Sequence, residues 1–270
     1  MLHLIAATQT EADPVISALK LKRTPASLNY YQKEETHLVV SGIGKCNAAT
    51  ACGWLAQKTQ QTSTDNNTSV AWLNFGIAGH VNAEPGTAFI AHKVTDFATE
   101  RVWFPHRLTD NITSSDLTTV DKPLQYYMPA QLHDMEASAY TEAARKFSDA
   151  ELVQTIKVVS DNETQPLANV NARLATKLIE DSIEPILHCI DTLKLLSQII
   201  PVTDSTAKQL ILDRWNFSVS QAVQLERLLQ RHEVLLGTLR DIPESQQQIK
   251  SSKELLIWLQ DKVDNADFTL

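Results

Sequence analysis

The sequence predicts an α/β fold, with a mostly parallel central sheet flanked by helices and an all-helical extension at the C-terminal end. Two observations support this prediction. Short apolar segments alternate with helical patterns as far as Ser160, which is typical of a largely parallel sheet. No later segment has the pattern of a strand. We therefore expect an α/β domain over residues 1–199 and a helical extension over residues 200–270.

Strands in the first half of the chain are expected wherever a short apolar run ends at a polar residue or a glycine. Helices are expected between them, over residues 11–20 and 45–57. The second of these helices is rich in Ala and Cys, which suits close packing on a sheet. The expected strands are residues 2–7, 37–41, 70–75, 87–95 and 117–120.

Beyond residue 120 the sequence predicts one more helix, over 135–147, and one more strand, over 155–160. The extension that follows has leucine-rich stripes on its helical faces, and Ser218 and Ser251 have the spacing of helix-capping residues. These stripes suit the core of the protein or a contact with a partner equally well. The role of residues 200–270 is therefore left open.

Composition excludes several classes of protein. The net charge of −8 argues against a general binder of nucleic acids or of anionic membranes. No apolar window is long enough to span a bilayer, and residues 1–7 lack the basic segment of a signal peptide. Three cysteines without framework spacing predict reduced thiols, so we expect a cytoplasmic protein. The histidines lack the spacing of metal ligands, and no metal site is expected.

The most informative residues are acids near the ends of the expected elements. Asp134 and Glu136 flank Met135 at the expected start of a helix, and Ser160 and Asp161 close the last strand. Acids at such positions usually line a crevice. Simpler interpretations exist. Asp134 and Glu136 could be acids in the first turn of a helix, where the helix dipole stabilises them. Asp161 could cap a turn, and Met135 could belong to the core.

Glu11 follows the first strand and could likewise be no more than an acid in the first turn of a helix. Glycine pairs follow the next two strands, at Gly42 and Gly44 and at Gly76 and Gly79. Glycine at these positions allows a sharp turn or a close approach of the backbone to a ligand. Together these segments predict a binding crevice at the ends of the strands.

Taken in order, these strand-end segments resemble the purine nucleoside phosphorylase superfamily, and particularly its methylthioadenosine/S-adenosylhomocysteine nucleosidases. The resemblance covers roughly residues 1–195 and none of the extension. It implies a nucleoside phosphorylase-like fold, a purine nucleoside substrate, no cofactor and a homo-oligomer. The segments that carry it are residues 7–11, 41–45, 74–79, 134–137 and 160–161.

The resemblance also implies roles for individual residues. Asp161 would donate a proton to N7 of the purine, with Ser160 orienting it. Glu136 would bind the ribose hydroxyls beside Asp134, and Met135 would pack against the face of the sugar. These residue types suit the reaction, because a purine leaves readily only when protonated and a carboxylate stabilises positive charge growing on the sugar.

Glu11 occupies the position of the carboxylate that activates water in the nucleosidases. The segment formed by Gly76, Ile77, Ala78 and Gly79 would lie along the sugar and the position of the attacking water or phosphate. The resemblance therefore implies two carboxylates near the reacting carbon, one for the sugar and one for the nucleophile.

Phosphorylases of this superfamily hold phosphate with arginine and serine, where this chain has Asn74 and Ile77. Water is therefore favoured over phosphate as the nucleophile. Lys45 or Arg101 could still supply a cation for phosphate, so phosphorolysis stays an alternative at this point.

The stretch between Gly79 and Asp134 is several dozen residues shorter than is usual in the family. The missing residues normally supply strands, part of the subunit interface and the aromatic side chain that stacks on the base. Local aromatic residues that could form this wall instead are Trp103, Phe104, Tyr126 and Tyr127.

The leading prediction is a nucleosidase that cleaves the N-glycosidic bond of a purine nucleoside, with or without a 5′ modification. One alternative is a phosphate-dependent purine nucleoside phosphorylase that uses the same pocket. Another is a non-catalytic nucleoside-binding protein whose extension serves oligomerisation or partner docking. A dinucleotide-binding protein is disfavoured because no Gly-x-Gly-x-x-Gly motif follows the first strand.

Overall fold

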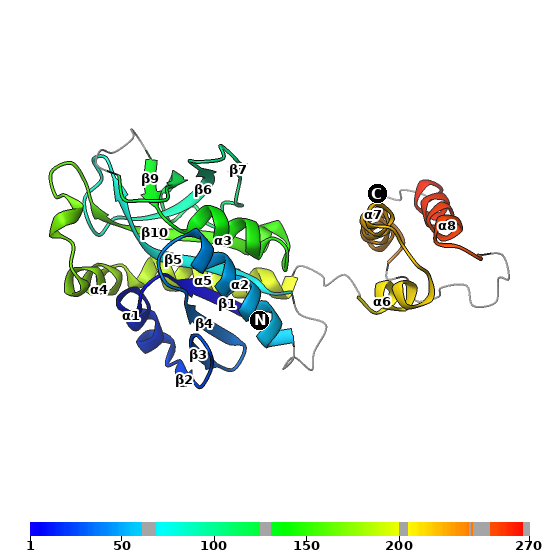
Figure 1. Cartoon of the computed structure of the whole chain (residues 1–270), viewed down its shortest axis with the longest axis horizontal. Coiled ribbons are helices and arrows are strands. Elements are labelled where there is room, and N and C mark those ends of the chain that lie inside the picture. Colours follow the sequence, from blue (N-terminus) through cyan, green and yellow to red (C-terminus); the bar gives the residue numbers. More distant parts are fainter. Residues whose placement is uncertain (61–68, 125–130, 200–204, 238, 240–248, 267–270) are drawn as a thin grey trace. The chain divides into compact units, whose positions relative to one another are not determined.

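A computed structural model describes residues 1–60, 69–124, 131–199, 205–237, 239 and 249–266 (Figure 1). The described residues up to Ile199 form one compact unit, and those from Ser205 onward form a second. No helix of the described residues is both long and apolar enough to cross a membrane.

The first unit is built on a ten-stranded mixed sheet. Its strands are β1 (Leu2–Ala6), β2 (Lys22–Thr24), β3 (Asn29–Lys33), β4 (Thr36–Val40), β5 (Ala71–His80), β6 (Ala88–Asp96), β7 (Val102–Trp103), β8 (Ser114–Thr119), β9 (Gln131–Asp134) and β10 (Val153–Asp161). The central strands β4, β1, β5 and β10 run parallel, as predicted. Strands β2, β3 and β4 are joined by short turns and pair antiparallel, so the sheet as a whole is mixed.

Strand β5 is long enough to belong to two parts of the sheet. Its first half pairs with β1, and its far end pairs with β9. Strands β9, β8, β6 and β10 then continue the pairing and return to β5, so that five strands close a ring. Gly79 near the end of β5 lies opposite both His133 of β9 and Asp161 of β10. The ring therefore brings the predicted site residues of β5, β9 and β10 to one place.

Helices cover both faces of the sheet, which confirms the predicted α/β class (Figure 1). Helices α1, α4 and α5 share a core with one face, and α2 and α3 share a core with the other. The bounds are α1 (Gln9–Leu19), α2 (Lys45–Gln60), α3 (Ala137–Ala144), α4 (Ala172–Asp181) and α5 (Ile183–Ile199), with 3-10 turns at Ala150–Leu152 and Leu167–Asn169.

Helix α3 begins later than the sequence predicted. Asp134 still belongs to β9, and Glu136 is the N-cap residue with non-helical backbone angles. The Asp134 carboxylate accepts the backbone N–H of Ala137 at 2.9 Å, which satisfies a donor that the helix leaves unpaired at its start. Met135 and Glu136 therefore lie between a strand and a helix instead of on the helix itself.

The second unit consists of three helices around a leucine-rich core. Ser218 and Gln221 form the predicted capping box, and the Ser251 hydroxyl accepts the backbone N–H of Glu254. The helices are α6 (Ser205–Arg214), α7 (Val219–Leu236) and α8 (Ser252–Asp264). The core contains Ile211, Leu225, Leu228, Leu229, Leu255, Leu256 and Leu259.

Candidate active site

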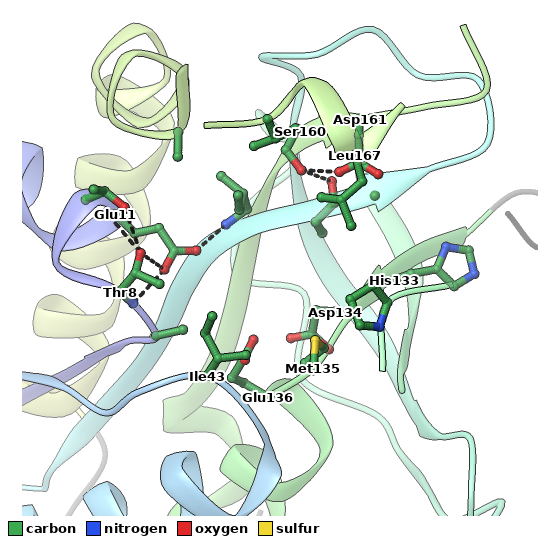
Figure 2. A pocket seen from close by; sticks show the side chains of 18 of the residues that line it. Thr8, Glu11, Ile43, His133, Asp134, Met135, Glu136, Ser160, Asp161 and Leu167 are labelled. Atoms are coloured by element: carbon green, nitrogen blue, oxygen red, sulfur yellow. Dashed lines mark hydrogen bonds between the residues drawn. The ribbon is translucent and has the colours of Figure 1, made fainter. Parts of the chain in front are cut away.

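A cavity of about 420 Å³ lies where β5, β9 and β10 end (Figure 2). Every predicted site residue except Gly76 lines it. The predicted residues that line it are Glu11, Ile77, Ala78, Gly79, Asp134, Met135, Glu136, Ser160 and Asp161. They come from four segments far apart in the sequence, and the fold brings these segments together around one cavity.

Glu11 is fixed by the start of α1. Its Oε2 accepts the backbone N–H of Thr8 at 2.8 Å and the Thr8 hydroxyl at 2.7 Å, and its Oε1 accepts the backbone N–H of Ile77 at 2.9 Å. Thr8 and Glu11 form a capping box. Glu11 is thus a first-turn helix acid and a pocket residue at the same time, so the two interpretations of this residue are compatible.

Gly76 does not line the cavity, but it leaves space for the side chain of Glu11. A Cβ atom at Gly76 would lie 2.5 Å from Glu11 Oε1, closer than real Cβ atoms approach another atom. The missing side chain therefore makes room for the carboxylate of Glu11 against β5.

A buried lysine lies among the carboxylates. Lys157 in the middle of β10 has a side chain only 2% exposed, and its Nζ lies 2.9 Å from Asp134 Oδ2 and 3.9 Å from Glu136 Oε2. Asp134 Oδ1 also accepts the hydroxyl of Thr119 at 2.7 Å. Asp134 is therefore held from several sides and fixes the ammonium in place.

Lys157 keeps its charge despite its burial. Burial by itself lowers the pKa of this lysine, but the carboxylates of Asp134, Glu136 and Glu11 outweigh it, and the net pKa is raised. A permanent positive charge thus compensates part of the negative charge that these acids concentrate in the cavity.

Glu136 titrates near neutral pH. Burial, together with the charge of Asp134, raises the pKa of its carboxyl to about 7 against the opposing effect of Lys157. The backbone N–H of Gly44 donates to Glu136 Oε1 at 2.8 Å and stabilises the ionised form. Small changes around this carboxyl will therefore change its charge at physiological pH.

Asp161 lies at the end of β10, where the pairing with β5 is irregular between Val159 and Asp161. The Ser160 hydroxyl donates to Asp161 Oδ1 and also lies 3.3 Å from the carbonyl oxygen of Ala78. In Figure 2, Asp161 lies across the cavity from Glu11, with Met135 and Glu136 on a third side.

No family model matches the chain, and none of the curated proteins compared with it does. Solved structures do resemble it. A methylthioadenosine/S-adenosylhomocysteine nucleosidase from S. pneumoniae has a TM-score of 0.56 and 21% identity, covering 72% of this chain and 99% of that one. The first unit has the nucleosidase fold.

Two further structures share this fold. A nucleosidase from Colwellia psychrerythraea, in complex with adenine, has a TM-score of 0.55 and 19% identity, covering 71% of this chain and 95% of that one. The futalosine hydrolase of Helicobacter pylori has a TM-score of 0.55 and 13% identity, covering 70% and 97%. The predicted likeness to the nucleosidases is therefore confirmed for the fold.

The nucleosidase fold of this chain contains pocket residues that the sequence did not predict. Lys157 does not line the cavity itself but pairs with the lining residue Asp134, and it has the clearest signal in hindsight, because a lysine inside an apolar strand must find buried partners. Among the lining residues, the sequence also missed His133, which lies on β9 next to Asp134. The remaining unpredicted lining residues are Ala7, Thr8, Thr10, Ile43, Val120, Pro123, Leu124, Leu167, Val170, Asn171, Ala172 and Ala175.

The predicted aromatic wall is not formed by the residues that can be traced. Trp103 is buried in a core cluster with Ala91 and Val94, and Phe104 is exposed; neither lines the cavity. Trp103 packs there because β7 pairs with the edge of β6. Tyr126 and Tyr127 lie outside the described residues.

The two cations considered for phosphate binding have other partners. Lys45 contacts Asp96 and Asp121, and Arg101 contacts both oxygens of Glu142 at 2.8 Å. No lysine or arginine is among the described residues that line the cavity. Within the traced parts of the chain, no group of three or more His, Cys, Asp or Glu side chains is arranged to hold a metal ion.

Proposed function

We propose that this protein is a nucleosidase that hydrolyses the N-glycosidic bond of a purine nucleoside, with or without a 5′ modification. One observation carries the proposal: Glu11, Glu136 and Asp161 line a single cavity in a nucleosidase fold, next to a buried lysine. The adenine bound to the Colwellia nucleosidase supports a purine as the base.

Glu136 acts as the clamp for the sugar. Its carboxylate faces the cavity beside Met135, and each carboxylate oxygen can accept more than one hydrogen bond. Bonds from the ribose hydroxyls would hold the sugar, and the negative charge would stabilise the oxocarbenium-like transition state. Met135 would pack against the sugar face.

Asp161 acts as the acid for the base. A purine anion is a poor leaving group, so a proton must reach the ring as the glycosidic bond breaks. The hydrogen bond from Ser160 orients the Asp161 carboxyl at the end of β10. The proton that Asp161 delivers to N7 leaves with the neutral base.

Glu11 acts on the water. The two groups of donors that fix its carboxylate, at Thr8 and Ile77, hold it beside the sugar position. A water between Glu11 and the anomeric carbon would give its proton to this carboxylate as it attacks. The charge of Lys157 limits the repulsion between Glu11 and Glu136.

Hydrolysis suits this cavity better than phosphorolysis. A phosphate dianion needs cationic partners, and Lys45 and Arg101 already contact carboxylates. We also propose that the enzyme works in the cytoplasm as a homo-oligomer without a cofactor, as its resemblance to the nucleosidases implies. Light scattering of the purified protein would test the oligomeric state.

The direct test is incubation with methylthioadenosine, adenosylhomocysteine, inosine and adenosine, each with and without phosphate, followed by chromatography of the products. Free base without phosphate supports the proposal and names the substrate. Base release that requires phosphate would make the protein a phosphorylase. A nucleoside that binds in calorimetry but stays intact would support the non-catalytic alternative.

A further inference from the structure

Lys45 connects two carboxylates, those of Asp96 and Asp121, from different parts of the first unit. It is the first residue of α2, directly after Gly44. Its Nζ lies 2.9 Å from Asp96 Oδ2 and 2.7 Å from Asp121 Oδ1. The two carboxylates come from the end of β6 and from the segment that follows β8.

Asp96 is a fixed anchor. Its side chain is 7% exposed, and besides Lys45 it accepts the Ser138 hydroxyl of α3 at 2.8 Å and both the N–H and the hydroxyl of Thr99 at 2.9 Å. Burial would raise the pKa of Asp96, but these donors lower it to about 2. Asp96 is thus ionised throughout the physiological range and ties Lys45 to the body of the first unit.

Asp121, unlike the buried Asp96, is exposed to solvent over 62% of its side chain. It follows Val120 and precedes Pro123 and Leu124, and these three residues line the cavity. Apart from the contact with Lys45, no hydrogen bond or ion pair within the described chain reaches residues 121–124. Within the described chain, the ion pair with Lys45 is therefore the polar contact that ties residues 121–124 to the rest of the fold.

Lys45 also lies close in sequence to a second part of the cavity wall. Ile43, two residues before it, lines the cavity, and Gly44 donates its N–H to Glu136 at 2.8 Å. Gly44 has a φ of +102°, a conformation that favours glycine. Lys45, the next residue, is anchored by Asp96 and so restrains the backbone that carries the Gly44 N–H.

We propose that Lys45 is a positioning residue that holds the Ile43 wall and the 121–124 wall at the spacing a nucleoside requires and keeps the Gly44 N–H on Glu136. This inference rests on the proposed nucleosidase function. The exposed contact with Asp121 sets mainly the fit of the substrate. The buried contact with Asp96 sets mainly the position of Glu136 and hence the rate.

The test compares Asp121→Asn, Lys45→Met and Lys45→Arg with a control, Lys93→Met, which breaks the 3.0 Å pair between Lys93 and Asp116. Asp121→Asn should raise KM about threefold with kcat little changed, as for loss of an exposed ion pair. Lys45→Met should in addition lower kcat about tenfold, as expected when a catalytic group is misplaced. Lys93→Met should match the natural protein.

Two readouts separate positioning from mere folding. High salt should raise KM of the natural protein but not of Asp121→Asn, since that variant lacks the exposed pair that salt screens. Lys45→Met should need a higher pH for activity, because Glu136 loses a donor that stabilises its ionised form. Lys45→Arg should restore both contacts in part. Natural values of KM and kcat in Asp121→Asn and Lys45→Met would overturn the proposal.

The proposal can fail separately from the proposed function. Amide hydrogen exchange of residues 117–124 should be faster in Asp121→Asn and Lys45→Met than in the natural protein, whether or not any nucleoside is cleaved. Unchanged exchange in both variants would overturn the positioning role. Absence of both cleavage and nucleoside binding by the natural protein, with faster exchange in the variants, would overturn only the nucleosidase function. If Lys45→Met does not fold, the exposed Asp121→Asn variant decides the outcome.

Discussion

Glu136 combines burial with a titration near neutral pH, and this makes its charge the most pH-sensitive feature of the cavity. The pKa of its carboxyl is about 7. If the ionised form grips the ribose hydroxyls, kcat/KM should rise as pH increases through about 7. Glu136→Gln should remove this rise and lower kcat/KM by about 100-fold. A pH profile of both proteins measures this, and a rise that persists in Glu136→Gln would assign it to another group.

Asp161 should matter in proportion to how much the leaving group needs a proton. Asp161→Asn should lower kcat for a purine nucleoside by about 1000-fold, within the range of general acid catalysis. The loss should be much smaller for a riboside whose leaving group departs as a stable anion, such as nitrophenol. Steady-state kinetics with both substrates check this. Equal losses for the two would mean that Asp161 binds substrate instead of donating a proton.

At the residue scale, the sequence predicted the acids better than their partners. Glu11 and Asp161 were recognisable because each lies where an expected strand ends, and Glu136 because it and Asp134 flank Met135 at the expected start of a helix. Lys157 was not, because it lies inside a strand and its partners at Asp134 and Glu136 come from a different part of the chain. Such pairing depends on strand order, which a single sequence does not reveal.

The contact between β5 and α1 offers a test at the scale of elements. Gly76→Ala would place a Cβ atom 2.5 Å from Glu11 Oε1, and the carboxylate cannot move without losing its bonds to Thr8 and Ile77. We expect a loss of about 2 kcal/mol in the free energy of unfolding, typical of overpacking, together with loss of turnover. Urea unfolding and kcat measure the two effects.

Gly53 in α2 is the matched control, because a Cβ atom there would meet nothing within 4 Å. Gly53→Ala should leave turnover unchanged and should stabilise the protein by up to about 1 kcal/mol, since alanine favours a helix interior over glycine. If Gly76→Ala behaved like Gly53→Ala, the close approach of β5 to Glu11 would not be a requirement of the site.

Elements with strong hydrophobic patterns were predicted, and elements defined by tertiary pairing were not. The central strands β1, β4, β5 and β10 are almost fully buried and read as apolar runs. Strands β2 and β3 were missed because they are largely exposed and polar at the edge of the sheet. Likewise, nothing local in the sequence indicated that β5 would pair with both β9 and β10 to close the ring.

At the scale of the whole molecule, a row of aromatic side chains crosses three central strands. His3 of β1 pairs in register with His37 of β4 and with Trp72 of β5. The centroids of the His3 and Trp72 rings are 4.3 Å apart, and in the described structure neither His3 nitrogen has a hydrogen-bond partner. The His37 Nδ1 lies 2.7 Å from the hydroxyl of Tyr30. Both histidines are buried as neutral rings.

This row should make the fold sensitive to mild acid. Burial, with the charge of His37, holds the pKa of His3 well below 6.5, and burial lowers the pKa of His37 to about 4. Below about pH 6.5 the unfolded chain binds protons that the folded protein does not. The contribution of these histidines to the free energy of unfolding is therefore fully present above that pH and decreases toward pH 4. The loss from His37 alone is on the order of 3 kcal/mol.

His3→Phe should reduce this loss, because phenylalanine keeps the ring against Trp72 and takes up no proton. The free energy of unfolding in urea, measured at pH 7.5 and at pH 5, should differ less in His3→Phe than in the natural protein. Glu136 titrates in the same range with the opposite sign, since its raised pKa favours the folded protein as pH falls. It does so equally in both proteins, so the difference between them isolates His3.

The control is His188→Gln, at an exposed histidine of α5, which should keep the pH dependence of the natural protein. If the free energy of unfolding fell between pH 7.5 and pH 5 by the same amount in His3→Phe as in the natural protein, another group would be responsible for the fall.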